Sequence, residues 1–256
     1  MKFKILILLF TFSIIQIFAT SQEPDRIIIN NKEYALLNNP LDKYFENHPD
    51  DHPIYGHKIR MFNKYKKKIL PIPFRTSNYR GYIALFKIEN NQLSLVDLKV
   101  QKINSKKRKY ISVYQKLFGN KKIVLNYSGI LIIPTGKFIE AANFGYSSLY
   151  DQYQLMTVKN DTVVKEKQLN KDEFIGFKVN RFDEYKKTED YKTELKNYLN
   201  SWEEMKKSEL SQENTKGMSQ EEITELEKEY EHAPNEEYID NFLFLTRNTD
   251  FVIIDY

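Results

Sequence analysis

The spacing of apolar residues changes near Asn180, and this change limits the fold more than any other feature of the chain. Before it, from about Arg26 to Val179, short runs rich in Ile, Val, Tyr and Phe are separated by Asn, Gly or Pro. After it, apolar residues recur every three or four positions. A period of two indicates strands, and a period near 3.6 indicates helices. The sequence therefore predicts an α+β fold, β-rich over 22–180 and helical over 181–247.

Two hairpins give the clearest strand signals. One turns at Asn30 and Asn31, and the other turns at Asn90 and Asn91. Asparagine tolerates the positive φ that a tight turn requires. The second hairpin, 82–100, is apolar on both faces, so we expect it to lie centrally in the sheet. The predicted strands cover 26–29, 32–37, 82–88, 93–100, 122–125, 129–133, 137–141, 152–159 and 162–168.

The helical part is predicted to contain three helices. Large apolar residues from Tyr191 to Met205 step by four, three, four and three positions, which places them on one helix face. Ser219 and Glu222 form a capping box, so a second helix begins there. The predicted helices cover 182–210, 219–234 and 236–245.

The last residues, 248–256, include an apolar run from Phe251 to Ile254. Such a run is costly to leave in water, so we expect a terminal strand that returns to the sheet. The helices are then an excursion from a single domain over 22–256. The predicted architecture is an antiparallel β-meander, arranged as a sandwich or an open barrel and covered by the acidic C-terminal helices.

Residues 1–21 have the layout of a signal peptide. Lys2 and Lys4 give a basic start, an apolar run extends from Ile5 to Phe18, and small residues lead to Ser21. The apolar run is shorter than the roughly 20 residues that a membrane helix needs. The sequence therefore predicts cleavage after Ser21, export to the periplasm or the cell exterior, and no membrane span in the mature chain.

The chain contains no cysteine. This excludes zinc fingers, iron–sulfur clusters, cysteine nucleophiles and disulfide scaffolds, because each needs a thiol group. A domain of this length buries enough apolar surface to hold without disulfides, so an exported fold remains consistent with the composition.

Charge is divided between the two halves of the predicted mature chain. Residues 22–137 carry 22 basic and 9 acidic side chains, whereas residues 138–256 carry 15 and 26. A basic half is typical of a surface for an anionic partner. The simpler interpretation is a solvated lysine-rich face balanced by acidic helices. Since lysine outnumbers arginine 32 to 7, the bidentate contacts typical of nucleic-acid binding are scarce, and we predict no nucleic-acid partner.

Three of the four histidines lie within ten residues of one another. Imidazole and carboxylate groups are ligands that zinc and copper prefer. The prolines in this stretch exclude a helical i, i+4 arrangement, so an exposed loop is the alternative to a divalent-metal site. No other cofactor is predicted. The candidate metal ligands are His48, Asp50, His52 and His57.

No motif nominates a catalytic residue. Ser147 follows Gly145 as in a nucleophile elbow, but the second glycine of that motif is missing. The stretch 129–137 resembles a phosphate loop only superficially, because its glycine spacing is wrong and Phe138 replaces the metal-binding hydroxyl residue. Carboxylates near strand ends leave open a glycan hydrolase that uses a carboxylate pair; these are Glu89, Asp97, Glu140 and Asp151.

Aromatic residues cluster beside two turns. Tyrosine at the end of a sheet can stack on sugar rings or form a protein-recognition surface. Packing between the sheet and the helices is the alternative. Arg80 either anchors an anionic group or forms an internal salt bridge, and Gly81 indicates a bulge or a close backbone approach. The candidate ligand-binding residues are Tyr79, Arg80, Tyr82, Phe144, Tyr146 and Tyr150.

Two stretches of the β-rich part carry a resemblance. The hairpin over 80–97 begins Arg-Gly-Tyr-Ile-Ala-Leu-Phe, and the downstream stretch over 128–150 contains Ser-Gly-Ile-Leu-Ile-Ile-Pro-Thr-Gly-Lys and Phe-Gly-Tyr-Ser-Ser-Leu-Tyr. This pattern resembles one shared by exported bacterial proteins of unknown function and covers about 26–175. Those proteins usually have tryptophan before the Arg-Gly pair, where this chain has Tyr79. The resemblance implies a β-rich fold and export, and implies no activity.

Taken together, these features predict a non-enzymatic binding or interaction module of the periplasm or cell exterior, with a protein or glycan partner. The absence of catalytic motifs, the aromatic turn ends and the divided charge favour it. A glycan-acting hydrolase and a structural envelope component are the alternatives. The sequence leaves the oligomeric state open.

Overall fold

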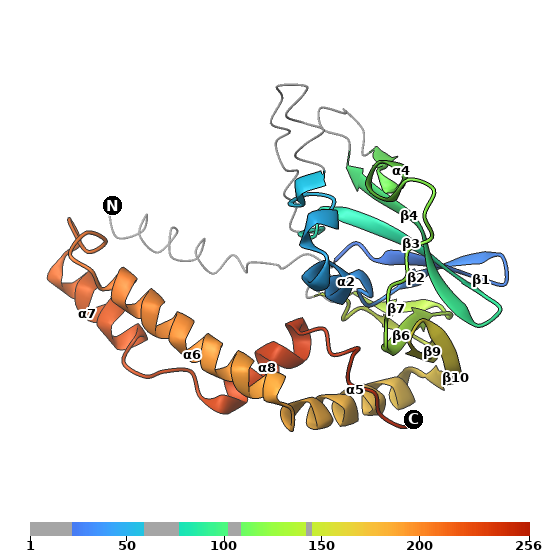
Figure 1. The fold of residues 1–256 in the computed structure, drawn as a ribbon. Coiled ribbons are helices and arrows are strands. Elements are labelled where there is room, and N and C mark those ends of the chain that lie inside the picture. Colours follow the sequence, from blue (N-terminus) through green and yellow to red (C-terminus); the bar gives the residue numbers. More distant parts are fainter. Residues whose placement is uncertain (1–21, 59–76, 102–108, 142–144) are drawn as a thin grey trace. The chain divides into compact units, whose positions relative to one another are not determined.

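The computed structural model describes residues 22–58, 77–101, 109–141 and 145–256 of the chain (Figure 1). Within them the fold is mixed, with a large, mostly antiparallel sheet of eight strands and six α-helices. The β-rich content expected from the sequence is therefore confirmed. The chain divides into two compact units. The sheet unit runs to Phe177 and includes Asp250–Tyr256, and the helical unit is Lys178–Thr249.

The sheet is not a simple meander. Strands β1 and β3 pair in parallel, while all other pairs of the large sheet are antiparallel. The chain between β1 and β3 includes β2 and helix α2 (Leu41–Asn47), and such a long connection permits parallel pairing. The expected all-antiparallel meander is thus wrong at this point. The strand order is β2 (Lys32–Leu36), β1 (Asp25–Ile29), β3 (Tyr82–Glu89), β4 (Gln92–Gln101), β10 (Thr162–Asn170), β9 (Gln152–Lys159) and β6 (Gly129–Pro134), and β5 (Tyr110–Ser112) pairs with β4.

Three hairpins turn on pairs of residues with positive φ, which confirms the turn chemistry expected from the sequence. The second hairpin, β3–β4, lies in the middle of the strand order, as predicted. The turn residues are Asn30 and Asn31, Asn90 and Asn91, and Asn160 and Asp161.

Two of the predicted strands differ in the structure. Residues 122–125 form no strand; they follow helix α4 (Tyr114–Phe118), and the backbone N–H of Leu125 is bound by a side chain instead of a neighbouring strand. The segment predicted at 137–141 forms β7 (Phe138–Glu140), which pairs with β8 (Leu149–Tyr150) in a separate two-stranded sheet. Sequence periodicity does not distinguish a short paired strand from an extended loop, because both alternate in the same way.

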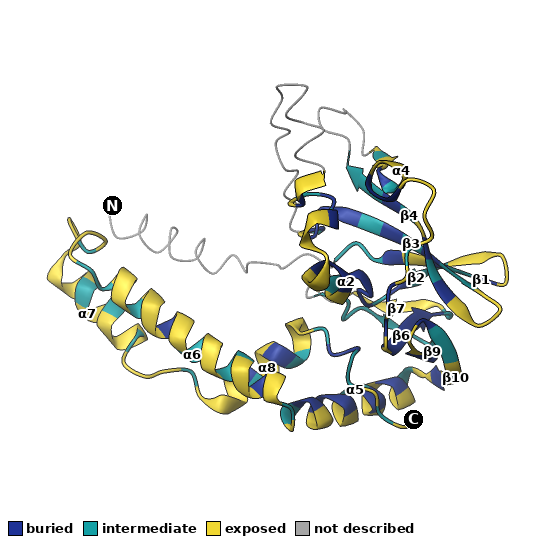
Figure 2. Ribbon diagram, in the orientation of Figure 1, coloured by how far each residue is buried: buried dark blue, intermediate teal, exposed yellow. Residues whose placement is uncertain are grey.

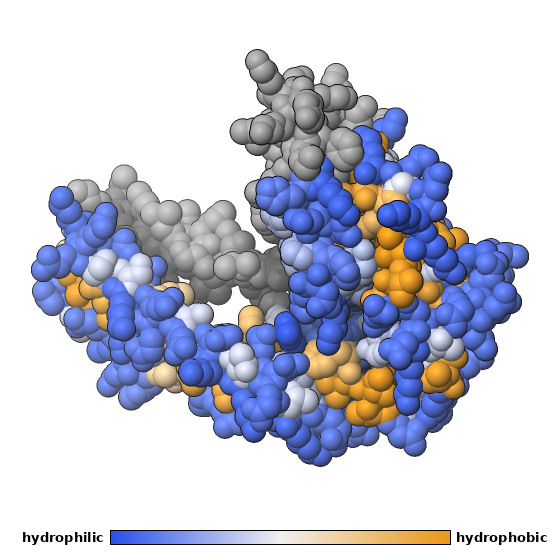
Figure 3. Space-filling view, in the orientation of Figure 1, coloured by the Kyte–Doolittle hydropathy of each residue, from blue (hydrophilic) through white to orange (hydrophobic). Residues whose placement is uncertain are grey.

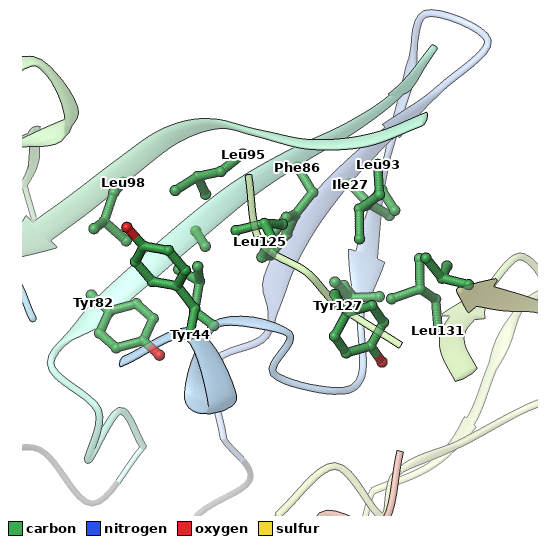
Figure 4. Close-up of a cluster of buried hydrophobic side chains, with 14 of the residues drawn as sticks. Ile27, Tyr44, Tyr82, Phe86, Leu93, Leu95, Leu98, Leu125, Tyr127 and Leu131 are labelled. Carbon is green, nitrogen blue, oxygen red and sulfur yellow. The ribbon is translucent and has the colours of Figure 1, made fainter. Parts of the chain in front are cut away.

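The large sheet has an apolar cluster on each face of β6 and β9. Leu131 and Met156 belong to the first cluster, which also receives side chains from α2, α4 and the segment around Leu125. Figure 4 shows Tyr44 of α2, Leu125 and Leu131 in this cluster. Ile130 and Leu155 belong to the second cluster. Burial on both faces explains why β6 is a nearly continuous apolar run, and the strands are correspondingly dark in Figure 2.

The two ends of the strand order approach each other without closing a barrel. One backbone hydrogen bond joins Leu37 N to Ile132 O at 2.9 Å. The neighbouring amides of β6 are bound by other groups: Ile132 N donates to Asn38 Oδ1 at 2.9 Å, and Ile130 N donates to Asp250 O at 2.8 Å. These contacts cover the outer edge of β6, which would otherwise offer unpaired amides to another chain.

The helical part of the chain starts earlier than the sequence predicts. Helix α5 (Lys171–Lys186) begins directly after β10, because Asn170 Oδ1 accepts the N–H groups of Asp172 and Glu173, each at 3.0 Å. The predicted end of the β-rich part at residue 180 is therefore about ten residues, or nearly three helix turns, too late. Asn170 and Glu173 have capping-box spacing, a signal that the sequence contained.

The predicted helix over 182–210 is two helices, α5 and α6 (Glu189–Glu209). Thr188 separates them, and its Oγ1 accepts the N–H of Tyr191 as an N-cap at 3.2 Å. The capping box of Ser219 and Glu222 is confirmed. The remaining helices are α7 (Gln220–Glu229) and α8 (Glu236–Thr246).

The predicted terminal strand is not formed. Residues 250–256 contact the sheet unit through one backbone hydrogen bond, from Ile130 N to Asp250 O, and through side chains: the hydroxyls of Tyr256 and Thr157 are 2.8 Å apart, and Ile254 packs on the second apolar cluster. Lys165 Nζ also donates to Tyr256 O at 2.8 Å. In the part of the chain that the structure describes, none of the helices has the length and apolar character needed to cross a membrane.

Candidate functional site

Arg80 lies at the centre of a buried polar cluster. Its side chain is 5% exposed. Its Nη1 donates to Asp25 Oδ2 at 2.8 Å, and its Nη2 donates to the Tyr146 hydroxyl at 2.9 Å and to Glu23 O at 3.2 Å. The guanidinium also lies 4.9 Å from the centre of the Tyr82 ring. The planar donor fork of arginine therefore joins three segments of the sheet unit.

Gly81, the residue after Arg80, has a backbone conformation that favours glycine. Its φ is +75°, which glycine adopts without strain, and its N–H donates to Asn78 Oδ1 at 3.1 Å. A Cβ at Gly81 would lie 2.9 Å from Cγ1 of Ile54. The group that lies close to Gly81 is the side chain of Ile54, not another backbone segment.

Asp25 is the buried partner of Arg80. It is 0% exposed, and its second oxygen, Oδ1, accepts the N–H of Ala84 at 2.8 Å. Burial raises the pKa of Asp25, while the charge and hydrogen bonds of Arg80 and the amide of Ala84 act in the opposite direction. Of the two sequence interpretations of Arg80, the geometry matches the internal salt bridge.

Asp42, in the first turn of α2, is a second carboxylate of the cluster. The Tyr82 hydroxyl donates to Asp42 Oδ1 at 3.4 Å. The pKa of Asp42 is raised to about 6: burial is the largest cause, the charge of Arg80 acts against it, and the charges of Asp250 and Asp25 add to it. A carboxyl group in this pKa range can hold or release a proton near neutral pH, as general acids do.

Tyr146 completes the cluster, because its hydroxyl donates to Asn39 Oδ1 at 2.8 Å while accepting from Arg80. We name the group of Arg80, Asp25, Asp42, Tyr82, Tyr146 and Asn39 the Arg80 cluster.

The six candidate ligand-binding residues are only partly brought together. Arg80, Tyr82 and Tyr146 belong to the Arg80 cluster. Tyr79 is 55% exposed. Tyr150 contributes to another aromatic group, beside β7 and β8, with its ring 5.7 Å from Phe138 and 6.0 Å from Tyr153. Phe144 lies outside the described residues.

Sequence reasoning missed Asp25, Asn39 and Asp42. A signal existed for Asp25, because it lies two residues before Ile27 and four before Ile29, on the buried face of β1. Extending the period of two backward from these isoleucines places Asp25 in the core. No comparable signal marked Asn39 or Asp42, which reach the cluster through the position of α2.

The histidines of the candidate metal site make local contacts. The His48 ring stacks on Tyr44 at 4.4 Å, and its Nδ1 lies 3.0 Å from Tyr44 O. His52 Nδ1 accepts the N–H groups of Ile54 and Tyr55, each at 3.2 Å. Burial lowers the pKa of His52 to about 4. Nδ1 of both rings is thus occupied by backbone groups.

Asp51 is the buried carboxylate of this stretch, whereas Asp50 and His57 are exposed. Asp51 accepts the Tyr44 hydroxyl at 2.8 Å and pairs with Lys58. No group of three or more His, Asp or Glu side chains suited to a metal ion occurs within the described ranges. The metal site predicted from the sequence gains no support from these contacts.

The strand-end carboxylates have local partners. Glu89 pairs with Lys87 at 2.7 Å, Asp97 accepts the Ser112 hydroxyl at 2.6 Å, and Asp151 accepts a backbone N–H. Glu140 is exposed on β7. None of these contacts joins two carboxylates. Elsewhere, the charge of Asp25 helps to raise the pKa of Asp42.

Comparison of the chain with protein-family models, with curated proteins and with solved structures found no significant match. What the Arg80 cluster does must therefore be argued from its geometry.

Asp42 and His52 give the stability of the fold opposite dependences on pH. Since the native pKa of Asp42 is about 6 instead of 3.8, stability falls as pH rises from about 4 to about 6. Since the native pKa of His52 is about 4 instead of 6.5, stability rises over nearly the same range. Relative to the wild type, we expect the profile of Asp42→Asn to rise more with pH and that of His52→Gln to fall more. Urea unfolding between pH about 4 and about 6.5 measures this; an Asp42→Asn profile equal to the wild type would contradict it.

Proposed function

We propose that this chain is an exported, non-enzymatic binding module that recognises a negatively charged protein through lysines of the sheet unit. One observation carries the proposal. Between Asp97 and Glu140 the chain has ten basic residues and no acidic one. Lys116, Lys121 and Lys122 of this segment are exposed. None of them forms an ion pair with a described carboxylate, although the charge of Lys122 reaches the exposed Glu89, which pairs with Lys87. A surface of unpaired like charge attracts an oppositely charged partner and speeds association.

The segment that presents these lysines is anchored on the fold. Leu117 and Phe118 of α4 are buried in the first apolar cluster. The Tyr114 hydroxyl donates to Lys121 O at 3.0 Å. Val124 is 64% exposed beside the lysines and adds apolar contact area. A surface held in place before binding loses less conformational entropy when the partner arrives. We name Lys116, Lys121, Lys122 and Val124 the lysine surface.

The Arg80 cluster supports a binding module over an enzyme. Arg80 and Tyr146 direct their hydrogen bonds to neighbouring protein groups, and Asp25 is 0% exposed. A group engaged in this way stabilises the fold, whereas a substrate-binding group keeps a hydrogen bond for its ligand.

Export belongs to the same proposal and rests on the basic start, apolar run and small residues of 1–21. The finer fold prediction, a sandwich or an open barrel covered by acidic helices, also remains a proposal. The hydrogen bond between Leu37 and Ile132 supports the open barrel. A structural envelope component remains the third interpretation.

One experiment tests export and binding together. The full chain with a C-terminal tag is produced in its own host, captured from envelope extracts at about 50 mM salt, and washed at about 500 mM, where surface charges are screened. We expect an exported chain that begins at Gln22 and an acidic partner that is released at high salt. Lys121→Glu with Lys122→Glu should reduce capture by about tenfold or more, equivalent to about 1.4 kcal/mol.

The matched control is Lys159→Glu with Lys167→Glu, which makes the same change of charge on exposed residues of β9 and β10. It should leave capture unchanged. Equal loss in both double variants would show a non-specific charge effect, and a chain that retains residues 1–21 would contradict export.

A glycan-acting hydrolase is the second candidate. The half-buried Asp42, with its pKa raised to about 6 beside Asp25, favours it. Two carboxylates at a suitable separation can act as acid and base or nucleophile. Release of reducing ends from envelope glycans by the wild type, lost in Asp42→Asn, would support this candidate over the binding module.

A further inference from the structure

Helix α8 has two apolar faces and buries only one of them. Ile239 and Leu243 are 0% and 4% exposed. Tyr238, Phe242 and Leu245 are 59%, 41% and 40% exposed, and their spacing of four and three positions places them on one stripe. We name these three residues the α8 stripe.

The α8 stripe is braced by the neighbouring helix. The ring of Tyr198, on α6, lies 5.4 Å from the ring of Phe242 in an edge-on arrangement. Large apolar side chains held together on the surface of a soluble protein typically mark an interaction site. The visible face of the helical unit is largely hydrophilic, with small scattered apolar patches (Figure 3).

Charge indicates the kind of partner that the stripe accepts. Residues 178–249 carry 11 basic and 18 acidic side chains. Two of the acidic residues, Glu236 and Glu237, are exposed in the first turn of α8, directly before Tyr238. An apolar stripe with acidic neighbours fits a basic surface that has an apolar residue of its own.

The lysine surface of the same chain has this composition. It combines Lys116, Lys121 and Lys122 with the exposed Val124. The predicted mature part of the sheet unit carries 26 basic and 17 acidic residues, an excess of nine basic charges against seven acidic ones in the helical unit. Every copy therefore supplies both complementary surfaces at equal concentration.

We propose that copies of this chain associate head to tail, with the α8 stripe of one copy contacting the lysine surface of a second copy. The two surfaces differ, so the contact is heterologous and each complex retains one free surface of each kind. Such a contact extends to higher oligomers unless a ring closes. This proposal depends on the proposed function only because both use the lysines of the lysine surface.

Sedimentation velocity of the exported full chain tests the proposal at about 20 mM and about 500 mM salt. At low salt we expect a weight-average mass at least twice that of the monomer, rising with protein concentration, and at high salt the monomer. Tyr238→Glu with Phe242→Glu, and separately Lys121→Glu with Lys122→Glu, should each give a monomer at low salt.

Mixing these two double variants provides the decisive measurement. Each keeps one intact surface, so an equimolar mixture should form a 1:1 dimer that does not extend further. Two control variants should associate like the wild type: Met205→Glu with Met218→Glu, and Lys159→Glu with Lys167→Glu, all at exposed positions. Circular dichroism confirms that each variant is folded.

A wild type that is monomeric at low salt would overturn the proposal, as would a mixture of the two variants that stays monomeric. The two proposals can fail independently. If the chain is monomeric but still captures an acidic protein through Lys121 and Lys122, the proposed function holds and self-association is wrong. If the chain self-associates but captures no other protein, self-association holds and the proposed function is wrong.

Discussion

Replacing Arg80 with methionine is expected to lower the free energy of unfolding by about 3–5 kcal/mol, because the substitution leaves a buried carboxylate without its cation. Asp25 is 0% exposed, and its remaining partner is the N–H of Ala84. The variant also removes the donors to Tyr146 and to Glu23 O. Urea unfolding at pH about 7, where an unpaired aspartate would otherwise ionise, measures the loss.

The double variant Arg80→Met with Asp25→Leu is the informative control. Removing both charges eliminates the unpaired carboxylate, so we expect it to recover at least half of the lost stability. Arg26→Met is the matched control, since Arg26 pairs with Glu33 at 3.9 Å and both side chains are about half exposed. It should change the free energy of unfolding by less than about 1 kcal/mol. An equally small effect for Arg80→Met would show that the ion pair does not hold the cluster together.

This measurement also separates the two interpretations of Arg80. An arginine kept for an anionic ligand has its charge poorly compensated in the free protein, so its replacement by an apolar residue costs little stability or increases it. An arginine that joins Asp25, Tyr146 and the backbone of Glu23 contributes to the native state itself. Loss of stability on replacement therefore supports a structural role for Arg80. In that case the partner is bound by the lysine surface and not by Arg80.

The sequence predicted best those features that neighbouring residues determine. The asparagine turns at residues 30–31 and 90–91 and the capping box at Ser219 depend on a few adjacent positions, and all are present. The sequence did not predict the break between α5 and α6, because large apolar residues occur on both sides of Thr188. The hydrophobic period indicates which face is buried, and it does not indicate a two-residue interruption of a helix, here at Lys187 and Thr188.

Features that depend on distant residues were not predictable in the same way. The parallel pairing of β1 with β3 joins Arg26 to Leu85, and nothing local to either strand specifies it. The candidate site shows the same limit. Arg80, Tyr82 and Tyr146 attracted notice as an arginine and tyrosines beside turns, but Asp25 lies 55 residues from Arg80 in the chain. A single sequence shows that such an arginine needs a partner, and only the fold identifies it.

Asp161 shows how one distant carboxylate replaces a predicted strand. Its Oδ2 accepts the N–H groups of Leu125 and Asn126 at 2.9 and 3.0 Å, and its Oδ1 accepts the N–H of Tyr127 at 2.8 Å. Asp161 is 8% exposed, so these bonds are shielded from water. The amides of this segment are thus bound by a side chain of the β9–β10 turn, and the segment needs no neighbouring strand.

We therefore expect Asp161→Ala to lower the free energy of unfolding by about 3–5 kcal/mol, because it leaves backbone donors without an acceptor in a shielded position. Part of this loss comes from the backbone, since Asp161 has a φ of +64° and alanine is strained there by about 1–2 kcal/mol. Asp161→Gly removes the carboxylate without this strain, so it should cost correspondingly less than alanine. The difference between the two variants in urea unfolding gives the backbone contribution.

Two further variants test how much of the stability loss comes from the hydrogen bonds of the Asp161 carboxylate. Asp161→Asn keeps one oxygen that can accept hydrogen bonds and should lie between the wild type and Asp161→Gly. Asp151→Ala removes a turn carboxylate that accepts one exposed N–H, that of Lys137, and should cost about 1 kcal/mol or less. If Asp161→Gly were as stable as the wild type, the apolar contacts of Leu125 and Tyr127 alone would position the segment. The Asp161 carboxylate would then accept hydrogen bonds from residues 125–127 without being needed to position them.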